Sequence, residues 1–197
     1  LPSPRKTTNL NSGWNYAASQ MVESAELIGV DEQIWTAVDL PHSWNQWDAT
    51  DLIPGYRRDV SWYVKELEYQ VEDGRRYFLF LEGENLITDV FVNGQKVGKH
   101  IGGYVGFRME ITQFLSMEAS NQIQVRVDNS HNLELIPSNK ADFFIYGGIT
   151  RDVWLEDLPT TMLTDVSVSI PEVSASRAVT NVQFRLDQPS ASKYRAE

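Results

Sequence analysis

Apolar and polar residues alternate in short runs along most of the chain, and no segment sustains the 3.6-residue repeat of a helix. The run IQVRV at 123–127 alternates at every position, which predicts a strand with one buried and one solvated face. The run YFLFL at 77–81 is apolar throughout, as expected for a strand covered on both faces. Residues 109–115 could hold one helical turn, and residues 17–34 give no clear pattern. The pattern predicts an all-β protein.

Turn-forming residues separate these runs at short intervals. The pair Asn93-Gly94 lies between two strand-like runs and is the strongest hairpin signal, because both central residues of a type I′ turn need a positive φ. Many short strands joined by Gly, Asn, Asp and Pro turns are typical of an antiparallel sandwich. We therefore expect a jelly-roll-type antiparallel β-sandwich.

A domain boundary is expected near Leu158-Pro159, so that residues 1–158 form the sandwich and residues 159–197 begin a second domain. Two alternating segments follow the boundary, at 165–170 and 181–186. They predict the first strands of an immunoglobulin-like sandwich, which is incomplete because such a domain needs about 100 residues. Two strands alone are marginal in water. Their apolar face therefore needs a cover, and self-association into a homo-oligomer is one hypothesis.

Composition excludes several classes of function. The formal net charge of −10, without a basic cluster, argues against binding to nucleic acid or to an anionic membrane. The chain has no cysteine, which excludes disulfides and thiolate chemistry. No apolar stretch approaches the roughly 20 residues of a membrane-spanning helix. The first residues lack the apolar core of a signal peptide and resemble a trimmed end, and a periplasmic or extracellular location is the favoured expectation.

Seven segments together resemble the sugar-binding N-terminal domain of glycoside hydrolase family 2, which includes β-galactosidases, β-glucuronidases and β-mannosidases. They follow one another in the order of the family over residues 13–158. The segments are LPHSWN at 40–45, PGYRR at 54–58, SWYVK at 61–65, DVFVNGQKVG at 89–98, GGYVGF at 102–107, VRVDN at 125–129 and DFFIYGGITRDVWL at 142–155. Each segment is weak alone, and the ordered series is specific.

The resemblance implies a parent enzyme in which a (β/α)8 barrel follows the two β-domains and hydrolyses glycosides with retention. Retaining enzymes use two carboxyl groups about 5 Å apart. In the family the acid glutamate follows an asparagine, and no Asn-Glu pair occurs in this chain. A barrel of about 250 residues does not fit within it either. We therefore expect no catalytic residue here, a glycoside substrate bound through the parent, and a parent of β-galactosidase type, with β-glucuronidase as the alternative.

Asp142 is the candidate substrate-binding residue. In the family, the aspartate that opens this segment reaches into the active site of the barrel and accepts hydrogen bonds from a sugar hydroxyl, directly or through a cation. A carboxylate suits this role because charge-assisted hydrogen bonds are strong. The alternative is that Asp142 caps a local turn. Among the aromatic residues that follow, alternation predicts Phe144 and Tyr146 on one face and Phe143 on the other.

An alternative of a different class is a free-standing carbohydrate-binding or assembly module. Trp44, Trp47 and Tyr56 lie in one turn-rich stretch, where aromatic rings could stack on pyranose faces. The tryptophans of the strand-like runs are expected in the core or at domain contacts; they are Trp14, Trp35, Trp62 and Trp154. The three histidines are too far apart in sequence for a metal cluster; they are His42, His100 and His131. No cofactor or metal is predicted.

Overall fold

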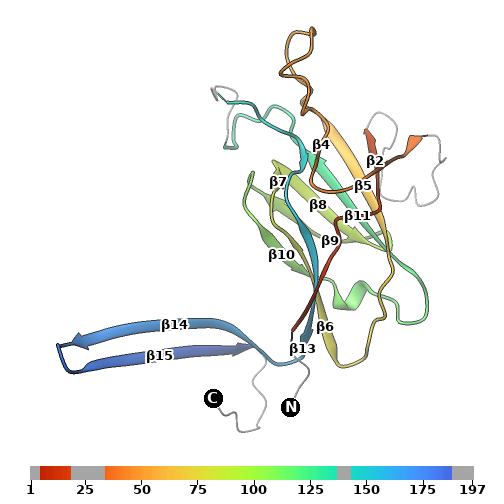
Figure 1. Cartoon of the computed structure of the whole chain (residues 1–197). Helices are drawn as coiled ribbons and strands as arrows, with labels where there is room; N and C mark the ends of the chain where they lie inside the picture. Colours follow the sequence, from red (N-terminus) through yellow and green to blue (C-terminus); the bar gives the residue numbers. More distant parts are fainter. Residues whose placement is uncertain (1–4, 19–33, 137–142, 188–197) are drawn as a thin grey trace.

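The computed structural model describes residues 5–18, 34–136 and 143–187, and within them the chain is built from antiparallel strands (Figure 1). A four-stranded sheet has the order β1 (Lys6–Asn9), β13 (Val153–Pro159), β6 (Arg75–Leu81) and β10 (Phe107–Glu110). A six-stranded sheet has the order β3 (Thr36–Val38), β2 (Trp14–Ala18), β5 (Val60–Leu67), β11 (Asn121–Asp128), β8 (Ile87–Val92) and β9 (Gln95–Ile101). The two sheets form the predicted jelly-roll-type sandwich.

The core lies between these two sheets. Ile123, Val125 and Val127 of β11 are fully buried in it, as their alternation predicts. The indole of Trp14 is also fully buried, and its Nε1 donates a 2.6 Å hydrogen bond to the carbonyl oxygen of Leu10. Burial of so large a side chain with its polar atom satisfied contributes strongly to stability.

The predicted hairpin at Asn93-Gly94 is confirmed. The two residues have φ angles of 51° and 77° and connect β8 to β9. Glycine tolerates this region without cost, and asparagine tolerates it better than most residues. The expected helical turn is also present, as a single 3-10 turn at Thr112–Phe114 (η3).

A small third sheet closes one end of the sandwich. Its order is β4 (His42–Ser43), β12 (Gly148–Ile149) and β7 (Glu84–Asn85). Gly148 pairs with Ser43 on one side and with Asn85 on the other. These pairings bring three segments that are far apart in the sequence to one end of the molecule, where they build the site described below.

The two strands predicted after the boundary form a long hairpin, β14 (Met162–Val173) and β15 (Ala178–Asp187), which extends away from the sandwich (Figure 1). Within the described ranges these strands pair only with each other. More than half of the surface of Val166, Val168, Val182 and Phe184 is exposed. The base of the hairpin is attached to the sandwich, because Met162 packs with Phe78 and Leu158 and because Arg76 forms an ion pair with Asp187.

In the described part of the chain, no helix has the length and apolar character needed to cross a membrane. The segment that gave no clear pattern lies mostly at 19–33, outside the described residues. Before it, Ala17 and Ala18 belong to β2. After it, Ile34 and Trp35 pack on a small cluster formed by Ala17 and Trp62.

Candidate functional site

Asp142, the candidate substrate-binding residue, lies outside the described residues, and the structure describes the segment that follows it. Asn45 holds this segment with a fully buried side chain. Its Nδ2 donates to the carbonyl oxygens of Ile145 (3.0 Å) and Arg57 (3.1 Å), and its Oδ1 accepts from the backbone N–H of Gly147 (3.0 Å) and from the hydroxyl of Ser43 (2.9 Å). One amide thus uses all of its hydrogen-bonding groups to fix the chain just after Asp142.

Two further asparagines hold the same segment. Nδ2 of Asn85 donates to the carbonyl oxygen of Tyr146 (2.7 Å) and to the hydroxyl of Tyr104 (3.0 Å). Nδ2 of Asn129 donates to the carbonyl oxygen of Ile145 (3.4 Å). Since buried polar groups cost free energy unless they are paired, three buried amides around one irregular segment define its position closely.

The segment packs so closely against Trp44 and Asn129 that position 147 requires a glycine. A Cβ atom there would overlap the ring of Trp44 and the side-chain amide of Asn129. The chain is therefore closely packed at Gly147, directly before Gly148 begins the short strand β12.

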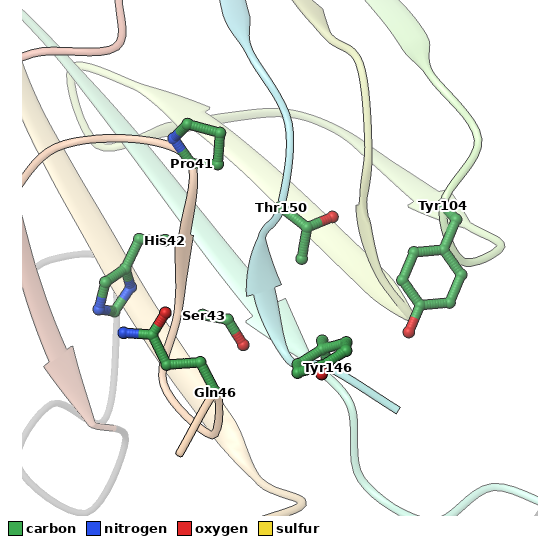
Figure 2. A pocket seen from close by; sticks show the side chains of 7 residues that line it. All are labelled: Pro41, His42, Ser43, Gln46, Tyr104, Tyr146 and Thr150. Carbon is green, nitrogen blue, oxygen red and sulfur yellow. The ribbon is translucent and has the colours of Figure 1, made fainter. Parts of the chain in front are cut away.

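The three asparagines form a clamp on residues 145–147. An open pocket of about 460 Å³ lies beside this clamped segment. The side chains that line it come from β4 and the loops on either side of it, from the loop before β10, and from both sides of β12. They are Pro41, His42, Ser43, Gln46, Tyr104, Tyr146 and Thr150. Figure 2 shows Tyr104 on the side of the pocket opposite His42 and Gln46. Hydroxyl, amide and aromatic groups converge here, which is the lining expected of a site for a polar, ring-shaped ligand.

His42 forms the link between this pocket and the core. Its Nδ1 lies 2.8 Å from the hydroxyl of Tyr63, a side chain with no exposed surface. Burial lowers the pKa of His42 and raises the pKa of Tyr63 well above its usual value. Both groups are therefore neutral near pH 7. The hydrogen bond to Tyr63 holds the imidazole of His42 in one orientation at the side of the pocket.

The aromatic residues that follow Asp142 divide between solvent and the loop at 46–58. Phe143 is largely exposed, and Ile145 is buried. The ring of Phe144 lies 4.2 Å from that of Tyr56 and 4.8 Å from that of Tyr146, measured between centroids. Phe144 and Tyr146 thus lie together, as alternation predicts.

The aromatic platform considered from sequence is divided in the structure. Trp44 is partly buried beneath the guanidinium of Arg57, which lies 5.4 Å from its ring centroid. Trp47 is 71% exposed, and Tyr56 packs on Phe144. Among the described ring contacts, none joins two of these three residues, and they do not form one stacking surface.

A buried acid that sequence reasoning missed lies in β7. Glu84 has no exposed surface, and its Oε1 is 3.9 Å from Nε2 of His100. Burial raises the pKa of Glu84 to about 9 and lowers the pKa of His100. Within the described ranges, no three acidic or histidine side chains converge in a way that could hold a metal ion.

Comparison with known proteins gives the family. The sequence model of "Glycosyl hydrolases family 2, sugar binding domain" matches residues 8–159. The chain is 47% identical over 175 residues to a protein of Formosa agariphila named "Putative beta-glucuronidase", covering 88% of this chain and 21% of that protein. It is 31% identical over 179 residues to a β-galactosidase of Thermoanaerobacter pseudethanolicus, covering 88% of this chain and 24% of the other.

Solved structures agree with the sequence matches. A β-glucuronidase of Bacteroides uniformis superposes with a TM-score of 0.78 at 30% identity, covering 91% of this chain and 22% of that one. The chain thus spans about a fifth to a quarter of the length of these relatives. The resemblance seen in the seven ordered segments is confirmed, and the chain belongs to glycosyl hydrolase family 2, carrying its sugar binding domain over residues 8–159.

Proposed function

We propose that this chain is the non-catalytic N-terminal region of a retaining glycoside hydrolase, in which it supports a catalytic barrel and contributes Asp142 to sugar recognition. The observation that carries the proposal is the clamp on residues 145–147. Three buried asparagines fix the segment that follows Asp142, and a polar pocket opens beside it. Such a clamp is suited to holding a binding group at a constant position, which recognition of a hydroxyl requires.

The substrate we propose for the parent is a β-glucuronide. Support comes from the relative that is 47% identical, which is named as a β-glucuronidase, and from the superposed structure of a β-glucuronidase. A β-galactoside is the second candidate. It is supported by the 31% identical relative that is named as a β-galactosidase.

Steady-state kinetics of the parent on p-nitrophenyl β-glucuronide and p-nitrophenyl β-galactoside test the substrate. The proposal expects the larger kcat/KM on the glucuronide. A larger kcat/KM on the galactoside would select the second candidate, and no turnover of either would contradict a parent of this class.

For the hairpin, we propose that it is the beginning of an immunoglobulin-like domain and that its uncovered apolar face lets the 197-residue chain self-associate. The face consists of Val166, Val168, Val182 and Phe184, each more than half exposed. Exposed apolar area of this kind favours association. Light scattering of the chain should show a dimer or larger species that Val168→Glu converts to a monomer. The matched variant Ser167→Glu, on the opposite face, should leave association unchanged, and a monomeric chain at high concentration would contradict the proposal.

The alternative of an independent sugar-capturing module makes a different prediction at the pocket beside β12. Because the chain supplies only one wall of an active site, galactose and glucuronate should bind this pocket no more tightly than about 1 mM, or about −4 kcal/mol. Isothermal titration that gives a submicromolar dissociation constant would favour the independent module.

A further inference from the structure

Trp154 of β13 and Phe80 of β6 stand side by side on the four-stranded sheet. They are direct partners in the antiparallel register. Their strand neighbours Leu79, Leu81 and Leu155 point into the core, so that Trp154 and Phe80 point to the opposite face. Both rings are partly exposed, and a cavity of about 240 Å³ opens over them.

Phe78, the next aromatic residue on this face, is covered and cannot contact a ligand. Phe78 is almost completely buried, with the guanidinium groups of Arg108 and Arg76 at 4.8 Å and 5.1 Å from its ring centroid. In the part of the chain that the structure describes, no cation lies over Trp154 or Phe80 in this way. These two rings therefore form the open part of the face.

The indole of Trp154 and the carboxylate of Glu156 are both held in position by polar partners. Nε1 of Trp154 donates a 2.8 Å hydrogen bond to Oε1 of Glu82, which fixes the plane of the indole. Glu156 is anchored by Nη1 of Arg108 at 3.1 Å and by Arg5 at 3.6 Å. Thr7 completes the rim with a hydroxyl-bearing, exposed side chain. A site whose groups are already oriented loses little conformational entropy when a ligand binds.

The geometry points to a binding site for a neutral pyranose ring, separate from the pocket beside β12. The C–H face of a pyranose is apolar and stacks on an indole or phenyl face, while its equatorial hydroxyls donate to carboxylates at the rim. Glu82 lines the cavity and forms no ion pair among the described residues, so its carboxylate disfavours a uronate by like-charge repulsion. The charge of Glu156, which also lines the cavity, is balanced by Arg108 and Arg5. The two sites share no lining residue, and this inference does not depend on the activity of a parent enzyme.

NMR of the six tryptophan indole N–H groups of the 197-residue chain tests the inference. The Trp154 signal is assigned by its loss in Trp154→Phe. On titration with methyl β-D-glucopyranoside it should shift with a dissociation constant on the order of 1–10 mM. Methyl β-D-glucuronopyranoside, which carries a carboxylate, should bind several-fold more weakly at this signal. Equal or tighter binding of the glucuronoside would overturn the assignment to a neutral sugar.

Two variants and one control separate binding from folding. Trp154→Ala should abolish the binding detected by titration calorimetry. Glu82→Gln keeps an oxygen that accepts the hydrogen bond from the indole, so the fold should stay intact. Sugar binding should weaken several-fold. This variant tests the site if Trp154→Ala fails to fold. Trp47→Ala removes an exposed tryptophan outside the cavity and should bind normally. The inference is overturned if the Trp154 signal stays unshifted, if Glu82→Gln binds as the unmodified chain does, or if the signal responds only to protein concentration.

Discussion

Glu84 and His100 lie next to each other inside one end of the sandwich, with Oε1 and Nε2 only 3.9 Å apart. Neither Nε2 of His100 nor either carboxyl oxygen of Glu84 has a hydrogen-bond partner among the described residues. The backbone of Glu84 also accepts a 2.8 Å hydrogen bond from the N–H of Tyr104, which lines the pocket beside β12. An unpaired buried acid thus lies directly behind one wall of the pocket.

The protonation of Glu84 should make stability depend on pH. Its pKa is about 9 in the folded chain against 4.5 as the reference value, so the folded state holds a proton that the unfolded state releases between these values. Stability therefore falls as pH rises through this window. Since His100 has a lowered pKa and acts in the opposite direction below pH 6.5, the effect of Glu84 is clearest from pH 6.5 to 9.

Glu84→Gln removes this cost, because the amide is neutral in both states. At pH 7 the variant should be more stable by up to about 3 kcal/mol, since each pH unit above 4.5 is worth about 1.4 kcal/mol. Urea unfolding at several pH values measures the difference. Glu118→Gln, at an exposed carboxylate, is the matched control and should leave the slope unchanged. Parallel curves for Glu84→Gln and the unmodified chain would show that Glu84 is ionised in the fold.

Asn45→Ala should destabilise the chain by about 3 kcal/mol, because it removes the hydrogen bonds to the carbonyl oxygens of Arg57 and Ile145 and to the N–H of Gly147. The carbonyl oxygen of Ile145 keeps only the 3.4 Å bond from Asn129. Asn181→Ala, at an exposed position of β15, should change stability by less than about 0.5 kcal/mol. Chemical denaturation compares the two. An Asn45→Ala chain as stable as the control would show that Asn45 does not stabilise the segment at 145–147.

Gly147→Ala should be more damaging than Gly74→Ala. The new methyl group at 147 overlaps Trp44 and Asn129, whereas the one at 74 meets open space and bears only the strain of a φ of 71°. That strain is worth about 1 kcal/mol. The overlap at 147 should cost more, because the packed ring of Trp44 has to move. The order of the two melting temperatures checks this, and a reversed order would contradict the close packing at 147.

Asp142→Ala in the parent enzyme should raise KM and lower kcat, with kcat/KM falling on the order of 100-fold, as expected for a lost charge-assisted hydrogen bond. Asp142→Asn keeps an acceptor oxygen and should be less severe. Asp73→Ala changes an exposed aspartate in a turn of the same chain and serves as the control. Unchanged kinetics for Asp142→Ala would leave it with the turn-capping role.

The features that the sequence predicts are those set by local chemistry or by a repeating pattern. Asn93-Gly94 specifies its own turn, and alternation at 123–127 identifies the buried face of β11. The clamp of Asn45 joins groups about 100 positions apart, and no local pattern marks it. Glu84 was missed for a similar reason: a carboxylate between Gly83 and Asn85 resembles a loop residue until pairing with Ile149 buries it.

Assay of the purified 197-residue chain on chromogenic β-glucuronide and β-galactoside tests the central claim most directly. Cleavage of a glycosidic bond requires an acid and a nucleophile about 5 Å apart. We predict no hydrolysis by the chain above the rate of buffer alone. Turnover by the isolated chain that disappears when one of its own carboxylates is replaced would contradict a non-catalytic role.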